Sequence, residues 1–279
     1  IEPDVVSGSG FYGVDYDKEV ESTGYFVQHQ YQTEKLHTQL GLRVEDHETF
    51  GTHTVGQVAA RYQLLPQTSI YSNIGTAFRA PTNNDLYALN WGGNPDLKPE
   101  ESISYEIGLD QIITDQFTFG LSIYRNEVDN LITWQNGKNF NVKEATFTGG
   151  ELNLNWANDD LFWDLGYAYV QPKDKATDTD LNRRPRQSLT LTTGLQNEVY
   201  GISTSLSAKS KPKNGSNVSG YATIDVNAYW NINQNVKVFT NIQNIGDVEY
   251  KTTSASQWGQ DIYYINGGRL ASVGVTFRY

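Results

Sequence analysis

The sequence predicts an all-β protein, specifically an antiparallel transmembrane β-barrel. Three observations lead to this fold class. Apolar and polar residues alternate along most of the chain, long and short connections alternate between the resulting strands, and the last strand keeps an apolar face up to an aromatic final residue, Tyr279. Because successive side chains of a strand point to opposite faces, this period gives one apolar and one polar face. A membrane barrel needs such strands and has long loops on one side only.

The strands are predicted from this period of two residues. The clearest stretches span residues 36–44, 103–110, 117–124, 161–169, 222–230 and 271–279. Counting weaker stretches, we expect about 13 strands, many of them longer than the ~5–6 residues common in soluble sheets. A soluble antiparallel sheet with one solvated face is the alternative interpretation.

The connections between these strands predict how the chain is oriented. Tight turns are expected near residues 33–34, 66, 114–115, 158–159, 197–198 and 233–235. Extracellular loops are expected near residues 46–52, 79–100, 172–184, 209–219 and 247–261, with 1–21 as a further outer loop before the strands of 22–279. Residues 136–138 are the exception, a short connection where a long one is due. The alternation puts Tyr279 on the periplasmic side, and residues 1–279 form one domain.

Charged side chains in these strands are expected to face away from lipid. The predicted inward set includes Glu106, Asp110, Arg125, Glu127, Asp129, Glu151, Asp164, Asp225, Arg269 and Arg278. A charge facing lipid would cost about 2–4 kcal/mol for Arg or Lys at the bilayer midplane. The interior is therefore predicted to be polar rather than an apolar core.

Composition excludes several other classes of protein. The net charge of −11 argues against nucleic acid as a partner, and the absence of Cys excludes a disulfide framework. No apolar run approaches the roughly 20 residues of a transmembrane helix. The chain contains no Met and opens with no signal-peptide pattern, so we expect a fragment or a processed product. No residue pattern predicts a catalytic centre, a metal site or a bound cofactor, and we expect no enzyme.

Several motifs resemble those of TonB-dependent outer-membrane receptors. They are Phe78-Arg-Ala-Pro81, Asn94-Pro-Asp-Leu-Lys-Pro-Glu100, Ser122-Ile-Tyr-Arg-Asn126, Gly149-Gly-Glu-Leu152, Asn241-Ile-Gln-Asn-Ile-Gly-Asp-Val-Glu-Tyr250 and the aromatic C-terminus. The resemblance implies a barrel of about 22 strands around an N-terminal plug, of which this chain holds the C-terminal part without the plug. It implies a location in the outer membrane of a Gram-negative bacterium. It also implies four partners: TonB acting through the plug, the barrel assembly machinery acting through Tyr279, lipid with lipopolysaccharide, and a small-molecule metal chelate.

Two segments resemble cobalamin receptors in particular. They are Gly13-Val-Asp-Tyr-Asp17 with the following Thr23-Gly-Tyr-Phe26, and Leu181-Asn-Arg-Arg-Pro-Arg-Gln187. The resemblance implies that Arg183 reaches the bound ligand. An ordinary interface or lumen charge is the alternative role for Arg183. Because loop 209–219 lacks the Tyr of cobalamin receptors, a ferric-siderophore or haem receptor remains the alternative function.

Aromatic residues in the predicted outer loops are further ligand candidates. They are Tyr87, Trp91, Trp134, Tyr250 and Trp258. Each ring offers a face for stacking on a flat macrocycle or a catecholate, although anchoring at the membrane interface is the role that the sequence favours. In the same region, the polar run of residues 83–85 is expected to cap a short helix. A barrel hydrolase or adhesin and a passive porin are the other functions considered.

Overall fold

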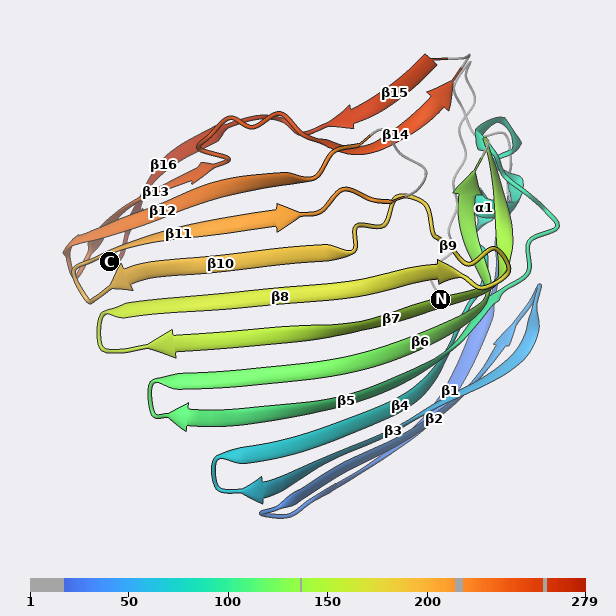
Figure 1. Ribbon diagram of the computed structural model, residues 1–279, viewed down its shortest axis with the longest axis horizontal. Helices are drawn as coiled ribbons and strands as arrows, with labels where there is room; N and C mark the ends of the chain where they lie inside the picture. Colours follow the sequence, from blue (N-terminus) through green and yellow to red (C-terminus); the bar gives the residue numbers. More distant parts are fainter. Residues whose placement is uncertain (1–17, 136, 214–217, 258–259) are drawn as a thin grey trace.

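One curved antiparallel sheet makes up most of the molecule (Figure 1). The computed structural model describes residues 18–135, 137–213, 218–257 and 260–279. The strands of the main path are β1 (Ser22–Gln32), β2 (Leu36–His47), β3 (Gly51–Leu65), β4 (Thr68–Arg79), β5 (Glu100–Thr114), β6 (Phe117–Gln135), β7 (Lys138–Ala157), β8 (Leu161–Asp174), β10 (Gln187–Gln196), β11 (Tyr200–Lys209), β12 (Tyr221–Asn233), β13 (Val236–Gln243) and β16 (Leu270–Phe277). They follow one another in chain order, which confirms the prediction of about 13 antiparallel strands.

The smaller elements lie in the connections. They are α1 (Asn83–Tyr87), the 3-10 helix η1 (Leu89–Trp91), β9 (Thr179–Asp180), which pairs with β8, and a separate hairpin of β14 (Lys251–Gln257) and β15 (Gln260–Ile265). The expected short helix is present, but its N-cap is Thr82 rather than a residue of the polar run 83–85. The Thr82 hydroxyl accepts from the backbone N–H of Asp85, and the Asp85 carboxylate accepts from that of Thr82, which is a capping box. No helix in the described part of the chain has the length and apolar character to cross a membrane.

All long connections lie at one end of the sheet, and the connections at the opposite end are all short (Figure 1). We call the end with the connections 33–35, 66–67, 115–116, 158–160, 197–199 and 234–235 the turn end. The loop end carries the connections 48–50, 80–99, 136–137, 175–186, 210–220 and 244–269. The C-terminus lies at the turn end (Figure 1). Two clusters of buried apolar residues in the described part of the chain, one around Leu131 and one around Leu86, belong to segments of the loop end.

The short connection at residues 136–137 joins two strands that extend beyond the rest of the sheet. β6 pairs with β5 only as far as Asp129, opposite Glu101, and β7 meets β8 only from Ala145 onward. Between these limits β6 and β7 continue to pair with each other up to Gln135 and Lys138. The expected long segment is therefore present as a hairpin arm of residues 130–144 rather than as a loop.

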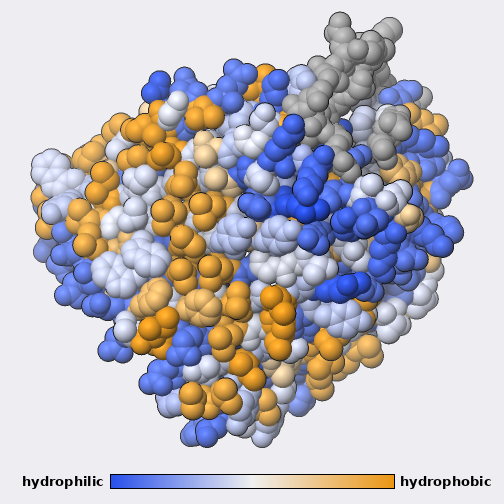
Figure 2. All heavy atoms as spheres, in the orientation of Figure 1, coloured by the Kyte–Doolittle hydropathy of each residue, from blue (hydrophilic) through white to orange (hydrophobic). Residues whose placement is uncertain are grey.

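The outward face of the sheet is apolar, as the alternation predicted. We call the opposite face, which carries Gly274 on β16, the inner face or inner wall. On β16, Val273 is 76% and Phe277 70% exposed, while Gly274 between them is half-buried. Three isoleucines on β4, β5 and β6, which are neighbours in the sheet, are likewise exposed: Ile74, Ile107 and Ile123. Figure 2 shows hydrophobic residues gathered over the strands and hydrophilic residues prevailing toward the loop end. In water such a surface would be unstable, and its natural surroundings are lipid.

The inward placement predicted for Arg125, Glu127 and Asp129 is wrong. Arg125 lies opposite Tyr105, and Glu127 lies opposite Ile103, so these charges share the outward face of Ile123. The reason is the length of β6, whose 19 residues span on the order of 60 Å. The outward positions change from apolar to charged after Ile123, where the strand extends toward the hairpin arm. The charges thus belong to the part of the strand beyond the apolar band.

Among the described residues, five aromatic rings on the inner face lie over glycines of the adjacent strand. The directly opposed pairs are Tyr71 with Gly108, Tyr124 with Gly149, Phe162 with Gly194, Tyr229 with Gly201, and Phe239 with Gly274. A Cβ atom at any of these glycines would collide with the ring, for example at 2.9 Å between Gly194 and Phe162. The missing side chain therefore lets each ring lie flat against the wall.

A methyl group at Gly108 is expected to force the Tyr71 ring away from the wall. The substitution Gly108→Ala should destabilise the folded state by about 1–3 kcal/mol, because overpacking forces a side chain out of its preferred rotamer. Urea unfolding of the protein in detergent micelles, followed by tryptophan fluorescence, measures the change.

Gly41→Ala is the matched control, since Gly41 also lies within a strand and a Cβ there would meet nothing within 4 Å. It should leave the free energy of unfolding unchanged or slightly raised. Equal destabilisation by both substitutions would show that the contact with Tyr71 is irrelevant.

Candidate functional site

Three segments of the loop end pack into one unit: connection 80–99, the hairpin arm of residues 130–144 and connection 175–186. The backbone N–H of Asn139 donates to the carbonyl of Gly92 at 2.7 Å, and the Asn94 amide donates to the carbonyl of Asn139 at 3.0 Å. Leu86, Leu97 and Ile132 are buried where the first segment meets the arm. The first connection is thus attached to the arm by hydrogen bonds and by apolar contact.

Connection 175–186 packs on the arm through Leu181. This side chain is 6% exposed in a cluster with Val128, Leu131, Val142 and Ala145. The connection is also closed on itself by a bidentate ion pair. The Arg186 guanidinium donates to both carboxylate oxygens of Asp180, each at 2.6 Å, and the Asp180 side chain is only 5% exposed. These bonds from Arg186 hold the pKa of the Asp180 carboxyl below its ordinary value.

Arg183 lies on this fixed connection next to Trp134 of the arm. Its guanidinium carbon is 5.1 Å from the centre of the Trp134 ring, which is cation–π geometry. Arg183 has a backbone φ of 61°, an uncommon conformation for a residue with a side chain. The next residue, Arg184, lies over the Phe147 ring at 5.3 Å. The predicted ligand residue Arg183 and the predicted aromatic Trp134 are therefore neighbours.

Tyr87 and Trp91 belong to connection 80–99, which packs on the same arm. Tyr87 packs against the buried Leu86 cluster, with the Lys18 ammonium 5.7 Å from its ring centre. Trp91 ends η1 and is 52% exposed. The following Gly92 has φ 82°, and a Cβ atom there would lie 2.9 Å from the indole nitrogen of Trp134. The segment of Trp91 thus contacts the ring that Arg183 covers.

Tyr250 stands apart from this unit, in connection 244–269. Tyr250 stacks on Tyr221, with ring centres 3.9 Å apart and planes at 13°, and burial raises its pKa. Trp258 lies outside the described residues. The structure therefore brings Arg183 and Trp134 into contact, places Tyr87 and Trp91 on the connection that packs on the same arm, and places Tyr250 in a different connection.

Sequence reasoning missed the ion pair that closes connection 80–99. Arg79 donates to both oxygens of Glu100 at 2.7 and 2.8 Å, and the backbone N–H of Ile132 donates to the same carboxylate at 2.7 Å. Arg79 and Glu100 belong to two of the motifs that carry the family resemblance, and they are the residues on either side of the connection. Opposite charges flanking a proline-containing loop were the signal available in the sequence.

The unit offers aromatic faces and guanidinium groups on a fixed scaffold. Such a surface suits a flat ligand that carries negative charge or hydrogen-bond acceptors. Within the described residues, no group of three or more His, Asp or Glu side chains is placed to hold a metal ion.

Removing the Arg186 guanidinium should loosen connection 175–186. Arg186→Gln leaves a carboxylate at Asp180 in a buried position, and breaking such a pair costs roughly 3 kcal/mol. Hydrogen exchange at the Leu181 amide, which donates to the Pro172 carbonyl at 2.7 Å, should accelerate accordingly. Because the folded pKa of Asp180 is lowered, the pair stabilises at neutral pH, and its contribution disappears as pH falls through that pKa.

Arg125→Gln is the control for this experiment. Its pair with Glu127 is exposed, with 49% and 37% of the two side chains accessible, and such pairs contribute about 0–1 kcal/mol. Exchange at Leu181 that is as fast in the control as in Arg186→Gln would contradict the assigned role of the buried pair.

Residues 3–245 match the family model described as TonB dependent receptor-like, beta-barrel. The chain is 31% identical over 262 residues to a protein named vitamin B12 transporter BtuB from Photobacterium profundum, covering 89% of this chain and 43% of the relative. A protein of the same name from Vibrio vulnificus is 26% identical, with 96% and 47% covered.

Solved structures share the fold at lower identity. The copper transporter OprC superimposes with a TM-score of 0.78 at 18% identity, covering 92% of this chain and 49% of that one. A variant of the ferric enterobactin receptor PfeA from Pseudomonas aeruginosa gives 0.77 at 19% identity, with 98% and 47% covered. The chain spans about half the length of the curated relatives that it matches. It belongs to the TonB-dependent receptor family, as part of the outer-membrane β-barrel.

Proposed function

We propose that this chain forms the C-terminal part of a receptor barrel that imports a scarce metal chelate, with cobalamin as the first candidate. Curated relatives that match most of the chain are named vitamin B12 transporters. The proposal places the loop end outside the cell and the turn end in the periplasm. The chain performs no chemistry on its ligand in this proposal, and no cofactor is needed.

The contact of Arg183 with Trp134 is the observation that carries this proposal. The cation and the ring lie 5.1 Å apart on segments fixed by the Asp180–Arg186 pair and the buried Leu181. A preformed site loses little entropy on binding, so it favours a rigid ligand. A corrin is rigid and flat, and it carries amide side chains that accept hydrogen bonds from a guanidinium.

A ferric siderophore, or haem, is the second candidate ligand. Solved structures of similar fold include a ferric enterobactin receptor, although at 19% identity this likeness shows the fold alone. The same aromatic rings and guanidinium groups would suit the aromatic rings and negative charge of an iron catecholate.

The proposal also names partners. A plug inside the barrel would connect the receptor to TonB, and Tyr279 at the turn end would be read by the barrel assembly machinery. The exposed apolar face, with Val273, Val275 and Phe277 on β16, would contact membrane lipid. Lipopolysaccharide would meet the outward charges of Arg125, Glu127 and Asp129 on β6.

Loss of either member of the pair should weaken ligand binding. In the complete receptor, Trp134→Ala or Arg183→Ala is expected to raise the dissociation constant for cobalamin about tenfold, since a partly desolvated cation–π contact contributes roughly 1–2 kcal/mol. Isothermal titration calorimetry in detergent measures the change.

Trp163→Phe serves as the control, because Trp163 is on β8 and shares the face of Leu161, away from the lumen. It should leave cobalamin binding unchanged. Tight binding of a ferric siderophore with no binding of cobalamin would overturn the assignment of the ligand.

A further inference from the structure

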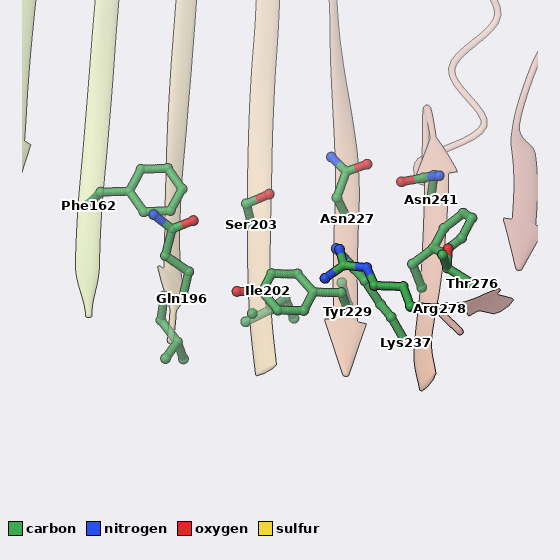
Figure 3. Close-up of a pocket in the computed structure, with 14 residues that line it drawn as sticks. Phe162, Gln196, Ile202, Ser203, Asn227, Tyr229, Lys237, Asn241, Thr276 and Arg278 are labelled. Carbon is green, nitrogen blue, oxygen red and sulfur yellow. The ribbon is translucent and has the colours of Figure 1, made fainter. Parts of the chain in front are cut away.

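The strands β3 and β4 diverge toward the loop end. They pair only as far as Gln57 opposite Gly75, although β3 begins at Gly51 and β4 continues to Arg79. β10 and β11 show the usual arrangement, because they pair over almost their full length, and Figure 3 shows side chains of these adjacent strands next to each other. A hollow of about 440 Å³ lies at the divergence of β3 and β4, lined by residues of this chain on both sides.

Side-chain contacts cross this divergence in place of the main-chain ladder. We call residues 44–56, the loop-end part of the β2–β3 hairpin, the hairpin tip. The backbone N–H of Gly56 in the tip donates to the Thr76 hydroxyl at 2.9 Å. The His53 ring stacks on the Phe78 ring, with centres 3.6 Å apart and planes at 16°. Nδ1 of His53 also lies 3.3 Å from a carboxylate oxygen of Glu101 on β5.

Both ring nitrogens of His53 face hydrogen-bond acceptors. Nε2 lies 3.0 Å from the backbone carbonyl oxygen of Phe50, and Nδ1 faces the Glu101 carboxylate. A neutral imidazole carries one N–H, whereas the imidazolium carries two. Only the charged ring can therefore donate to both partners at once. A positive ring also suits the carboxylate beside it and the aromatic face of Phe78 beneath it.

His47, on the other strand of the hairpin tip, makes the opposite kind of contact. Its Nδ1 accepts the backbone N–H of Thr49 at 3.2 Å, so this nitrogen carries no proton. The ring of His47 lies 5.2 Å from that of Phe50. Two histidines of one hairpin tip are thus held with different numbers of protons, and the difference comes from their partners.

Other charged groups surround His53. On β2, Glu45 lies directly opposite His53, but it accepts from the Arg43 guanidinium and the Ser22 hydroxyl. Further charged side chains line the hollow or neighbour Phe78 on β4: Arg79, Glu127, Asp129, Glu144 and Lys175. Among the described residues, Glu101 is the carboxylate within ion-pair distance of His53. Its contact is therefore the one that depends on the charge of the ring.

We propose that His53 is a pH-sensitive switch, which as an imidazolium ties the hairpin tip to β5 and as a neutral imidazole releases it. Imidazole changes its charge between about pH 5 and 8. The contact is complete at low pH and is lost as the pH rises through this range, because the deprotonated Nδ1 no longer donates. The Glu101 side chain is 61% exposed, so it can then turn to water.

Release of His53 would move the hairpin tip as a unit. The ladder between β2 and β3 extends to His47 opposite Gly51, so the tip keeps its own structure. Phe50 of the tip packs against the buried Leu86 cluster, which provides a route to connection 80–99. The inference rests on contacts within this chain and does not depend on which ligand the receptor binds.

Two spin labels measure the separation between the hairpin tip and the sheet. This chain contains no Cys, so Cys at the exposed positions of Thr49 in the tip and Ile107 on β5 can be labelled in the complete receptor, with any Cys elsewhere replaced by Ser. Double electron–electron resonance gives the distribution of distances. From about pH 5.5 to about pH 8, the ratio of long to short distances should rise about fivefold, because a charge-assisted hydrogen bond is lost.

Substitutions at the two partners separate a charge effect from a packing effect. Glu101→Lys should reverse the pH response, because an ammonium repels the imidazolium but donates to the neutral Nδ1. Glu101→Gln should abolish the response, because its amide can accept from one form of the ring and donate to the other. His53→Phe keeps a ring on Phe78 without any N–H, so its distances should be the same at both pH values.

His47→Gln and His37→Gln are the matched controls. Gln at position 47 keeps an acceptor for the Thr49 N–H, and His37 is exposed near the turn end of β2, so both variants should respond to pH as the unmodified chain does. Far-UV circular dichroism in detergent checks that each variant is folded. The proposal is overturned if the distances do not change with pH, if Glu101→Lys responds in the original direction, or if His47→Gln abolishes the response.

Discussion

Backbone hydrogen bonding in a medium without water is the constraint on which this structure depends. A peptide group left unpaired in hydrocarbon costs several kcal/mol, so a chain crossing a membrane must pair all of them. The antiparallel ladder from β1 to β16, with small register shifts in the pairs β3–β4, β5–β6 and β12–β13, meets this requirement within the sheet. Once the ladder exists, the alternation of side chains divides the protein into a face for lipid and a face for water.

This division explains why the molecule has no central apolar core in the described part of the chain. Most apolar side chains of the strands point outward, and the clusters of buried apolar residues among the described residues lie where the segments of the loop end pack on each other. There the usual rules of soluble proteins apply, with buried leucines, a capping box at Thr82 and bidentate ion pairs at Arg79 and Arg186. The strands thus face lipid, whereas the segments of the loop end pack as a soluble protein does. The candidate ligand residues that the structure brings onto the arm belong to these segments.

Strands and turns were predictable from the sequence because both depend on neighbours close in the chain. The placement of Arg125 was not, because the point where a strand leaves the membrane depends on its partners and not on its own alternation. The same limit applies to the site. Tyr87, Trp91, Trp134 and Arg183 could be selected one by one from the sequence. The contact of Arg183 with Trp134, and the packing of the Tyr87 segment on the same arm, depend on three distant segments that meet only in the fold. Tyr250 carries the same local signal and stacks on Tyr221 elsewhere.

The flat rings on the inner wall have a consequence for how the strands find each other. A slip of one residue between strands would turn apolar side chains into the lumen, so the hydrophobic pattern prevents it. A slip of two residues leaves every side chain on its original face of the sheet, so the hydrophobic pattern does not prevent it. It would, however, move Tyr71 from Gly108 to Glu106 or Asp110, and Phe239 from Gly274 to Ser272 or Thr276. The five glycines therefore favour one strand register over the others that keep the same faces, because in that register each ring lies opposite a residue without a side chain.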